Sequence, residues 1–304
     1  MDEYTRATKA WLEERFRTVD ADGVYVAHQP IYGLNAGHCE PAVLEKYVRT
    51  YHVVNALARI DFASLLDAGG AEGFKAHLVA TLFGARVRAC DLTEQACRRA
   101  REIFGIPADV ADLHDLPYGE GAFDVVLCSE SLEHVTDPWR ALAELVRVAR
   151  KAVVVTVPHE PEEVVERNVA DGEPHAHIHH FDERSFDVAR ELGCRVLVRR
   201  IASPVLRLPA KLLPVRRHED RGRYPRALLD VYNRAAPLLG RLAGEWAAAG
   251  VVRADGPVCR VAPGYEAVIA VLLKPGCTLS RGRRVAASRV VGCTVPLHRL
   301  ERPR

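Results

Sequence analysis

The spacing of apolar and polar residues predicts a central region in which short strands alternate with helices. Between residues 61 and 201, compact apolar runs alternate with segments in which apolar residues recur every three or four positions. The expected strands are 63–68, 85–90, 107–111, 123–128, 152–157, 195–201 and 265–273. The expected helices between them are 73–82, 93–104, 138–149 and 183–192. Because strands that alternate with helices are joined by right-handed crossovers, this order predicts an α/β fold with a seven-stranded, doubly wound parallel sheet.

Three segments fall outside this alternation. Residues 1–60 are expected to form a helical cover, with helices at 8–16 and 41–57 on either side of a loop. A basic, proline-broken stretch and then a helix-like stretch precede the last strand, and we expect them to form a helical insertion. The end of the chain is rich in arginine and only weakly periodic. The expected division is a cover at 1–60, a core at 61–202, an insertion at 203–263, the last core strand at 264–275 and a basic tail at 276–304.

Composition removes several classes of protein. The 304 residues include 42 basic and 40 acidic side chains, whereas a dedicated nucleic-acid binder usually carries a clear basic excess. No apolar run approaches the ~20 residues that a membrane-spanning helix needs, and the start of the chain has no signal-peptide pattern. We therefore expect a cytoplasmic protein with no membrane span and no nucleic-acid partner. The eight cysteines show no CxxC spacing, so reduced, buried thiols are expected.

The most specific chemical signal is a glycine-rich turn after the first expected strand. It reads Leu65-Leu66-Asp67-Ala68-Gly69-Gly70-Ala71-Glu72-Gly73. Glycines at the carboxyl end of a strand let the backbone approach a bound ligand closely. The dinucleotide fingerprint GxGxxG fails here, because the third and sixth residues counted from Gly69 are Ala71 and Phe74. A nicotinamide-dependent oxidoreductase is therefore disfavoured.

Acidic residues follow the next two expected strands. Asp91 ends the second strand, 24 residues after Asp67, and Asp112 follows the third. A carboxylate in the position of Asp91 can accept two hydrogen bonds from a ribose diol. Each acid on its own is also a plausible helix cap or solvated side chain.

Taken in order, these motifs resemble those of class I S-adenosylmethionine (SAM)-dependent methyltransferases, in a type 11-like subgroup. The turn is similar to the family pattern Asp-x-Gly-x-Gly-x-Gly, with Ala71 in place of the middle glycine. The segment from Asp112 to Tyr118 resembles Asp-x-x-x-Leu-Pro-Phe. The fourth strand and its sequel, Phe123-Asp124-Val125-Val126 and then Leu132-Glu133-His134, resemble the family's Phe-Asp-Val-Val and Leu-Glu-His. The resemblance is strong over about residues 61–160.

The resemblance implies a Rossmann-like methyltransferase fold with SAM as the cofactor. The acid at Asp112 would meet the adenine amino group. The residues expected to bind the cofactor are Asp67, Gly69, Gly70, Gly73, Asp91, Leu92, Asp112, Leu113, Ser129 and His134. No metal is assigned.

A histidine-rich stretch follows the fifth expected strand, at the same edge of the sheet, and is expected to be a loop up to about residue 181. It contains His159, His175, His177, His179 and His180. Three interpretations stay open. One histidine is a general base, since its pKa lies near working pH; the alternating histidines 175, 177 and 179 bind a metal; or the histidines are structural. Glu160 and Glu173 are further candidates, as ligands or orienting groups. The catalytic candidates are His177 and His179, followed by Glu130.

The resemblance implies transfer of a methyl group from SAM to an acceptor, which requires alignment of the reacting atoms and exclusion of water. We expect a small-molecule or glycan acceptor, methylated on a hydroxyl, in secondary metabolism or envelope synthesis. The alternatives are N- or C-methylation of a natural product, and a protein that binds SAM without catalysing transfer. Neither the acceptor nor the oligomeric state follows from the sequence.

Overall fold

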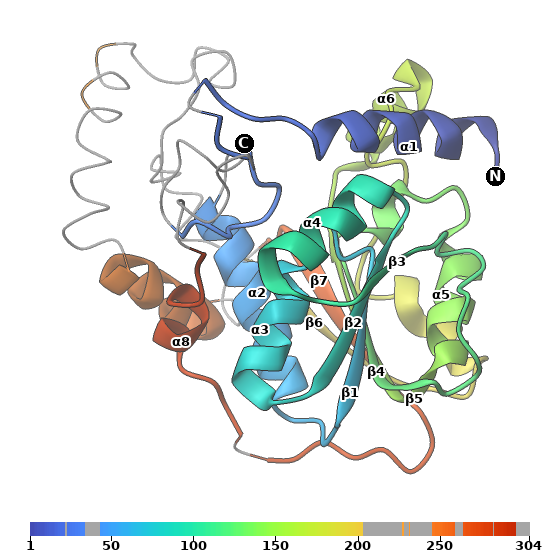
Figure 1. Ribbon diagram of the computed structural model, residues 1–304. Helices are drawn as coiled ribbons and strands as arrows, with labels where there is room; N and C mark the ends of the chain where they lie inside the picture. The colour runs from blue at the N-terminus through green and yellow to red at the C-terminus, as the bar shows by residue number, and fades with distance from the viewer. Residues whose placement is uncertain are drawn as a thin grey trace.

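The computed structural model describes residues 1–21, 23–33, 43–202, 227, 231, 245–258, 264–281 and 283–295. A twisted sheet stands at the centre with helices on both sides (Figure 1). The strands are β1 (Ser64–Ala68), β2 (Arg86–Asp91), β3 (Ala108–Val110), β4 (Phe123–Ser129), β5 (Ala149–Pro158), β6 (Arg195–Ile201) and β7 (Ala267–Leu273). Their order across the sheet is β3-β2-β1-β4-β5-β7-β6, which confirms the expected seven-stranded, doubly wound fold.

The sheet is mixed, whereas the pattern predicted a parallel one. The five strands from β1 to β5 pair in parallel, but β7 runs antiparallel to both β5 and β6. A parallel neighbour requires a crossover on the sheet face, while an antiparallel neighbour does not. The hydrophobic pattern cannot distinguish these two directions, because β7 is buried along its whole length.

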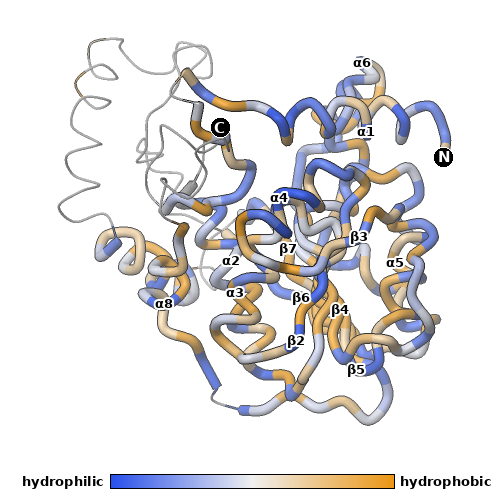
Figure 2. Tube along the Cα trace, viewed as in Figure 1, coloured by the Kyte–Doolittle hydropathy of each residue, from blue (hydrophilic) through white to orange (hydrophobic). Residues whose placement is uncertain are grey.

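The helices after the first four strands lie close to their expected positions. They are α3 (Phe74–Phe83), α4 (Glu94–Phe104) and α5 (Pro138–Val148). The side chain of Thr93 accepts a hydrogen bond from the Ala96 N–H at 3.3 Å, which confirms its role as the N-cap of α4. Helices α2 (Val43–Leu57) and α3 share one hydrophobic cluster with the sheet, and α5 shares another with the opposite face. Figure 2 shows the hydrophobic residues gathered along the central strands.

The N-terminal helix is longer than expected. Helix α1 (Glu3–Arg15) begins at residue 3 because the Asp2 carboxylate accepts hydrogen bonds from the N–H and the hydroxyl of Thr5, at 2.8 and 2.9 Å. In Figure 1 this helix crosses above the sheet, and α6 (Glu162–Asp171) also lies above it. It therefore lies over the edge where the sequence placed its candidate chemistry.

Two expectations for the histidine-rich region and its sequel were wrong. The stretch between β5 and residue 181 was expected to be a loop, but it contains α6, in which Val165 is the buried residue. One buried side chain gives too weak a periodicity to detect. The expected α-helix at 183–192 is instead a short 3-10 helix, η3 (Ser185–Arg190). A second short 3-10 helix, η2 (Leu132–His134), follows β4.

Part of the arginine-rich tail packs against the core. Helix α8 (Ala287–Val291) contacts α2, and Val285, Val290 and Val291 are buried in the same cluster. Most of the expected insertion, including residues 203–226, lies outside the described residues. Its described end, 245–258, is helical, and Asp255 there lies 2.7 Å from His52 of α2.

Two expectations from composition can be compared with the described residues. The six cysteines that the structure describes are free thiols, and four of them are buried. In the same part of the chain, no helix has the length and apolar content needed to cross a membrane.

Candidate active site

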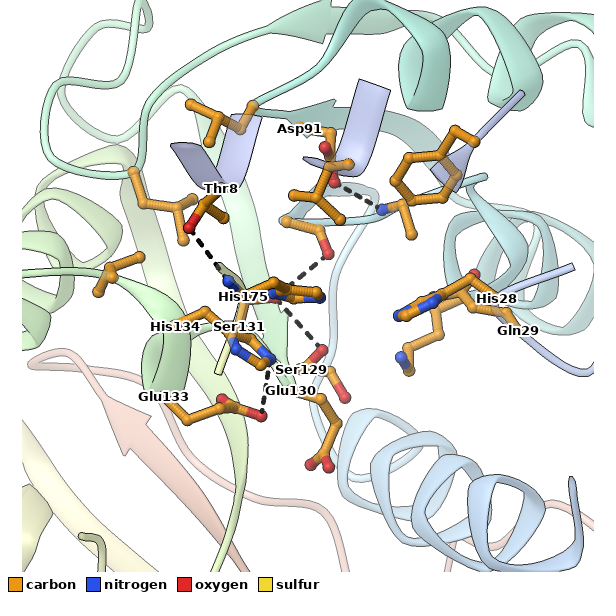
Figure 3. A pocket seen from close by; sticks show the side chains of 18 of the residues that line it. Thr8, His28, Gln29, Asp91, Ser129, Glu130, Ser131, Glu133, His134 and His175 are labelled. Atoms are coloured by element: carbon orange, nitrogen blue, oxygen red, sulfur yellow. Dashed lines mark hydrogen bonds and ion pairs between the residues drawn. The ribbon is translucent and has the colours of Figure 1, made fainter. Parts of the chain in front are cut away.

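A cavity of about 430 Å³ opens at the carboxyl ends of β1 to β4 (Figure 3). Its size is typical of small-molecule sites. One wall consists of the turns that follow these four strands, and we call it the motif wall. The other wall comes from α1, residues 28–30, the first turns of α2 and the segment around His175, and we call it the cover wall.

Seven of the predicted cofactor residues line the cavity. They are Gly69, Asp91, Leu92, Asp112, Leu113, Ser129 and His134. The strand-end turns therefore bring residues that are up to 65 positions apart into one wall. This grouping follows from the parallel register of β1 to β4, because the carboxyl ends of parallel strands meet at one edge.

The other three predicted cofactor residues lie behind this wall. Asp67 is 1% exposed, and its carboxylate accepts a hydrogen bond from the Ala76 N–H at 3.0 Å. Burial raises the pKa of Asp67 to about 6. A Cβ on Gly70 would lie 3.0 Å from the Asp67 carboxylate, and a Cβ on Gly73 would lie 2.9 Å from Ala100 of α4. These residues shape the turn and the helix packing, so the structure gives no support for direct contact with a ligand.

The turn after β1 shows why the family pattern asks for glycine. Gly69 has φ 70°, and a Cβ there would lie 2.4 Å from the Ser131 hydroxyl. Ala71 has φ 47°, a left-handed conformation that is unfavourable for a residue with a side chain. Ala71 thus carries backbone strain at the position of the family's middle glycine.

Asp91 holds the strained turn and faces the cavity. One carboxylate oxygen accepts the Ala71 N–H at 3.0 Å, and the other accepts the N–H and hydroxyl of Thr93, at 3.2 and 3.1 Å. Burial raises the pKa of Asp91, although the hydrogen bonds from Ala71 and Thr93 act to lower it. Each carboxylate oxygen has more than one lone pair, so Asp91 can both hold the turn and accept bonds from a ligand.

Asp112 is held in place by His114, two residues later in the chain. Its Oδ1 accepts the His114 backbone N–H at 2.9 Å and lies 2.6 Å from His114 Nδ1. The hydrogen bond from His114 lowers the pKa of Asp112. Asp112 is therefore a fixed acceptor on the motif wall, beside Leu113.

The cover wall is held together by contacts between distant segments. The Thr8 hydroxyl accepts the His175 N–H at 3.2 Å, and the Tyr4 hydroxyl donates to the Ala176 carbonyl at 3.2 Å. The Trp11 and His175 rings lie 5.2 Å apart. Glu13, also on α1, accepts the backbone N–H groups of Glu94 and Gln95 at the start of α4, at 2.9 and 3.3 Å. Helix α1 is thus bonded both to the histidine-rich segment and to the helix that follows Asp91.

Two of the three catalytic candidates line the cavity. Glu130 follows β4 with φ 59°, and its carboxylate pairs with the Arg49 guanidinium, which also contacts Glu45 at 2.6 Å. His177 lines the cavity, with Nδ1 2.9 Å from a carboxylate oxygen of Glu160.

His179 does not line the cavity. Its Nε2 lies 2.6 Å from the Val135 carbonyl, which gives it a structural contact in the segment after η2. Burial lowers its pKa. The geometry therefore supports the structural interpretation for His179 and gives no support for the catalytic one.

Several cavity residues had no place in the predicted site. The cover wall adds Thr8, His28, Gln29 and Arg49, and the motif wall adds Glu133. His175, which the sequence suggested only as one of three alternating metal-ligand candidates, also lines the cavity (Figure 3). Glu133 is 0% exposed, and burial raises its pKa well above the ordinary range. Its neighbour His134 is buried beside His175 and His177, and burial lowers its pKa. The Leu-Glu-His motif was the available signal for Glu133, whereas nothing local marks the cover-wall residues.

A family model described as "Methyltransferase domain" matches residues 66–157. The chain carries a class I SAM-dependent methyltransferase domain. The matched range contains the β1 turn, Asp91, Asp112 and the β4 motif, so the motif wall lies within this methyltransferase domain.

Curated relatives match about half of the chain. The chloroplastic tocopherol O-methyltransferase of Arabidopsis thaliana is 27% identical over 183 residues, which are 56% of this chain and 51% of that protein. The ubiquinone biosynthesis O-methyltransferase of Xanthomonas oryzae pv. oryzae is 34% identical over 154 residues, 47% of this chain and 56% of that protein. The chain thus spans about half the length of these relatives.

A solved structure extends the comparison to the fold of nearly the whole chain. Geranyl diphosphate C-methyltransferase from Streptomyces coelicolor A3(2) aligns with a TM-score of 0.52 and 15% identity, covering 90% of this chain and 98% of that one. At this identity the likeness supports the fold alone.

The residues of the methyltransferase domain fit SAM. The backbone of the β1 turn faces the cavity at Gly69, as close approach to the cofactor requires. The carboxylates of Asp91 and Asp112 stand on the same wall, where they would accept hydrogen bonds from ribose hydroxyls and an adenine amino group.

Proposed function

We propose that this protein transfers the methyl group of SAM to a hydroxyl group of a small organic acceptor. The observation that supports this is a cavity in which the motif wall of the methyltransferase domain, which includes Glu130, faces a cover wall that carries histidines and apolar side chains. Donor and acceptor would meet between the two walls. A biosynthetic, cytoplasmic role is part of the same proposal, and a sugar unit remains within the acceptor class.

Two points favour oxygen as the acceptor atom. A hydroxyl loses its proton when it is methylated, and His177 and Glu130 stand in the cavity as candidates to receive that proton. The two curated relatives compared above are both named O-methyltransferases. A neutral amine or a carbanion that is already formed would attack without first losing a proton and would place less demand on the wall.

The chain itself aligns the reactants and excludes water. SAM supplies an electrophilic methyl group when bound. Asp91 and Asp112 would hold its nucleoside end, which directs the reactive end toward Glu130 and His177. Trp11, Leu12 and Phe16 line the cover wall with apolar surface. Such an enclosed, oriented site supplies rate mainly through proximity and desolvation.

The direct test incubates the enzyme and SAM with matched panels of small phenols, aliphatic alcohols and primary amines. S-adenosylhomocysteine and the methylated product would be measured by mass spectrometry, and the methylated atom by NMR. We expect product from members of the hydroxyl panels. Product from amines alone would move the proposal to N-methylation.

A second measurement covers the non-catalytic alternative. Calorimetry with S-adenosylhomocysteine asks whether the cavity binds the cofactor product at all. Binding without product from a broad acceptor panel would favour a SAM-binding protein without transfer activity. Absence of binding would overturn the whole proposal.

A further inference from the structure

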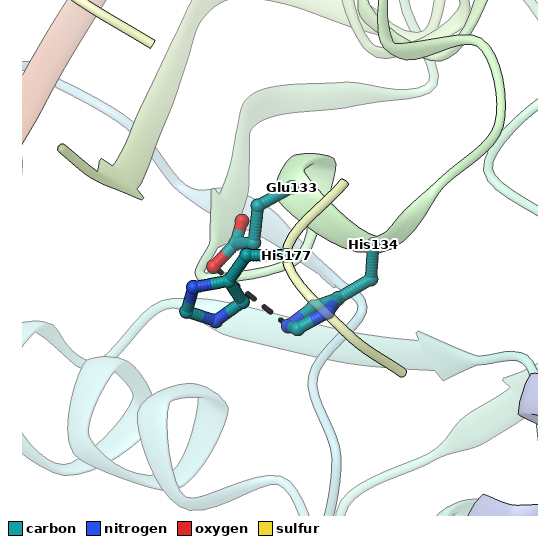
Figure 4. A group of neighbouring side chains, drawn as sticks. All are labelled: Glu133, His134 and His177. Atoms are coloured by element: carbon teal, nitrogen blue, oxygen red, sulfur yellow. Dashed lines mark ion pairs between the residues drawn. The ribbon is translucent and has the colours of Figure 1, made fainter. Parts of the chain in front are cut away.

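Three metal-ligating side chains converge at the inner end of the cavity. Glu133, His134 and His177 each offer one ligand atom within 4.8 Å of the other two, and all three line the cavity (Figure 4). Glu133 and His134 come from η2, and His177 comes from the histidine-rich segment more than forty residues later. This group is distinct from the 175, 177 and 179 set considered from the sequence.

The Glu133 carboxylate is deeply buried. It is 0% exposed, and neither of its oxygens has a hydrogen-bond partner among the residues that the structure describes. The nitrogen His134 Nε2 lies 3.9 Å from one of them, too far for a hydrogen bond, and the Arg49 and Lys75 cations act on the carboxylate without donating a hydrogen bond to it. A buried carboxylate costs several kcal/mol unless a proton, a donor or a cation compensates it. A metal cation bound directly to the carboxylate would supply this compensation.

Both imidazole rings are oriented as metal ligands usually are. His134 Nδ1 lies 3.0 Å from the Ala176 carbonyl, and His177 Nδ1 lies 2.9 Å from the Glu160 carboxylate. Carbonyl and carboxylate oxygens accept hydrogen bonds, so each Nδ1 is the donor, and in the neutral ring each Nε2 then keeps its lone pair. Metal-bound histidines nearly always donate their second ring N–H to such an oxygen.

We propose that Glu133, His134 and His177 bind one divalent transition-metal ion, with Glu160 and the Ala176 carbonyl as the groups that orient the two histidines. Two imidazoles and one carboxylate suit Zn²⁺, Fe²⁺ or Mn²⁺ better than Mg²⁺ or Ca²⁺, which prefer oxygen ligands. Metal bonds of about 2.0–2.1 Å separate neighbouring ligand atoms by roughly 3.3 Å. The 3.9 Å between His134 and Glu133 would close by less than about 1 Å.

An ion held by these three side chains would lie at the wall of the cavity. Three protein ligands leave at least one coordination position open, and all three ligands line the cavity in which donor and acceptor are proposed to meet. An ion there would polarise an acceptor oxygen. Metal binding itself requires neither SAM nor an acceptor, so it can be tested even where the proposed methyl transfer fails.

The test is calorimetry of ZnCl2 and MnCl2 into the full-length, untagged protein after removal of metals with EDTA. We expect one ion per chain. Glu133→Gln and His177→Ala should each weaken binding by at least about 100-fold, because the ligands act as a set. Glu163→Gln and His180→Ala, exposed positions with the same side-chain types, should leave affinity unchanged within about twofold.

A further variant probes the orienting group. Glu160→Gln keeps the shape of the side chain that contacts His177, and loss of such a contact typically weakens metal binding by about 10–100-fold. We also expect d–d absorption bands for the Co²⁺ form that are lost in His177→Ala. His177 is about one-third exposed, so this variant should fold even if Glu133→Gln does not. Absence of stoichiometric binding, or binding that persists in both ligand variants, would overturn the assignment.

Discussion

The two walls of the cavity are built in opposite ways. The motif wall is made of turns that each directly follow a strand, so the sheet itself places Gly69, Asp91 and Asp112 at one edge. The cover wall joins α1 to residues around His175, more than 160 positions later, through side-chain contacts. The difference indicates that the fold specifies the wall proposed to hold SAM, while the wall proposed to face the acceptor depends on how distant segments meet. Variants in each wall, and at a position outside both, test whether the two walls act separately.

The largest effect is expected at the cover wall. Replacement of His177 by alanine should lower kcat by at least about 100-fold, since the side chain either receives the hydroxyl proton or holds the proposed ion. The affinity for S-adenosylhomocysteine should change less than about threefold, because the nucleoside is assigned to the motif wall.

Steady-state kinetics and calorimetry on His177→Ala measure both quantities. His180→Ala is the matched control, since this exposed histidine lies on the same segment and does not line the cavity. Equal losses of kcat and of cofactor affinity in His177→Ala would show that the two walls do not act separately.

The next effect belongs to the motif wall. Asp91→Ala should weaken S-adenosylhomocysteine binding by about 1.5–3 kcal/mol, the scale of hydrogen bonds to a charged group. Loss of the Asp91 contact to the Ala71 N–H adds to this effect by freeing the turn. Calorimetry with Asp109→Ala as the control makes the comparison specific, because Asp109 lies on the next strand and pairs with Arg88 outside the cavity. Unchanged affinity in Asp91→Ala would reduce Asp91 to a structural residue.

A substitution outside both walls should change the stability of the protein without changing its affinity for the cofactor. Asp124, near the amino end of β4, accepts the Ala63 N–H at 2.8 Å and the Arg150 Nε–H at 2.9 Å. Asp124→Asn should lower the free energy of unfolding by about 1–3 kcal/mol at pH 7. Urea unfolding measures this loss, and cofactor affinity should stay the same.

The Asp124 contribution should also depend on pH. Burial opposes its charge, but the Ala63 N–H and Arg150 outweigh burial and hold the pKa of Asp124 below its ordinary value. The stability that it adds is therefore present above the unfolded pKa of about 3.9 and is lost as pH falls through the lower folded pKa. The difference in free energy of unfolding between wild type and Asp124→Asn should therefore decrease as the solution is acidified below pH 4. A constant difference would contradict this account.

The smallest effect tests the strained turn of the motif wall. Ala71→Gly should raise the free energy of unfolding by up to about 1 kcal/mol, since relief of the left-handed conformation outweighs the added freedom of the unfolded chain. The same change at Ala76, inside α3, should lower it by roughly the same amount. Thermal unfolding of the two variants gives the comparison, and destabilisation by Ala71→Gly would show that the turn carries no strain.

The motif wall could largely be predicted from the sequence. Alternating apolar runs locate the strands, and the residues after them, such as Asp91 and Asp112, reach the cavity. The motif does not say which side chains face inward, however. Asp67 and Gly73 keep the family spacing, yet Asp67 supports the turn and Gly73 lets α3 approach α4. The spacing predicts the shape of the turn. Which side chains face the cavity is decided by how the turn packs against the helices behind it.

The cover wall could not be predicted in the same way. Helix α6 has one buried side chain, so its periodicity was too weak to detect. The approach of His177 to Glu133 depends on the path of the chain between them, which is set partly by contacts of residues 175 and 176 with α1. No local pattern encodes contacts between segments so far apart. The sequence therefore suggested several roles for the histidines without choosing a partner for any of them.

The bond from Glu13 to the start of α4 has a consequence for how ligands communicate. Helix α1 touches the donor side through Glu94 and Gln95 and the acceptor side through His175. A ligand on either side that favours this position of α1 lowers the cost of ordering it for the second ligand. By thermodynamic linkage, SAM would then raise the affinity for the acceptor by the same factor as the acceptor raises the affinity for SAM. One carboxylate at a helix terminus would in this way set the cooperativity between two substrates that never share a ligand group.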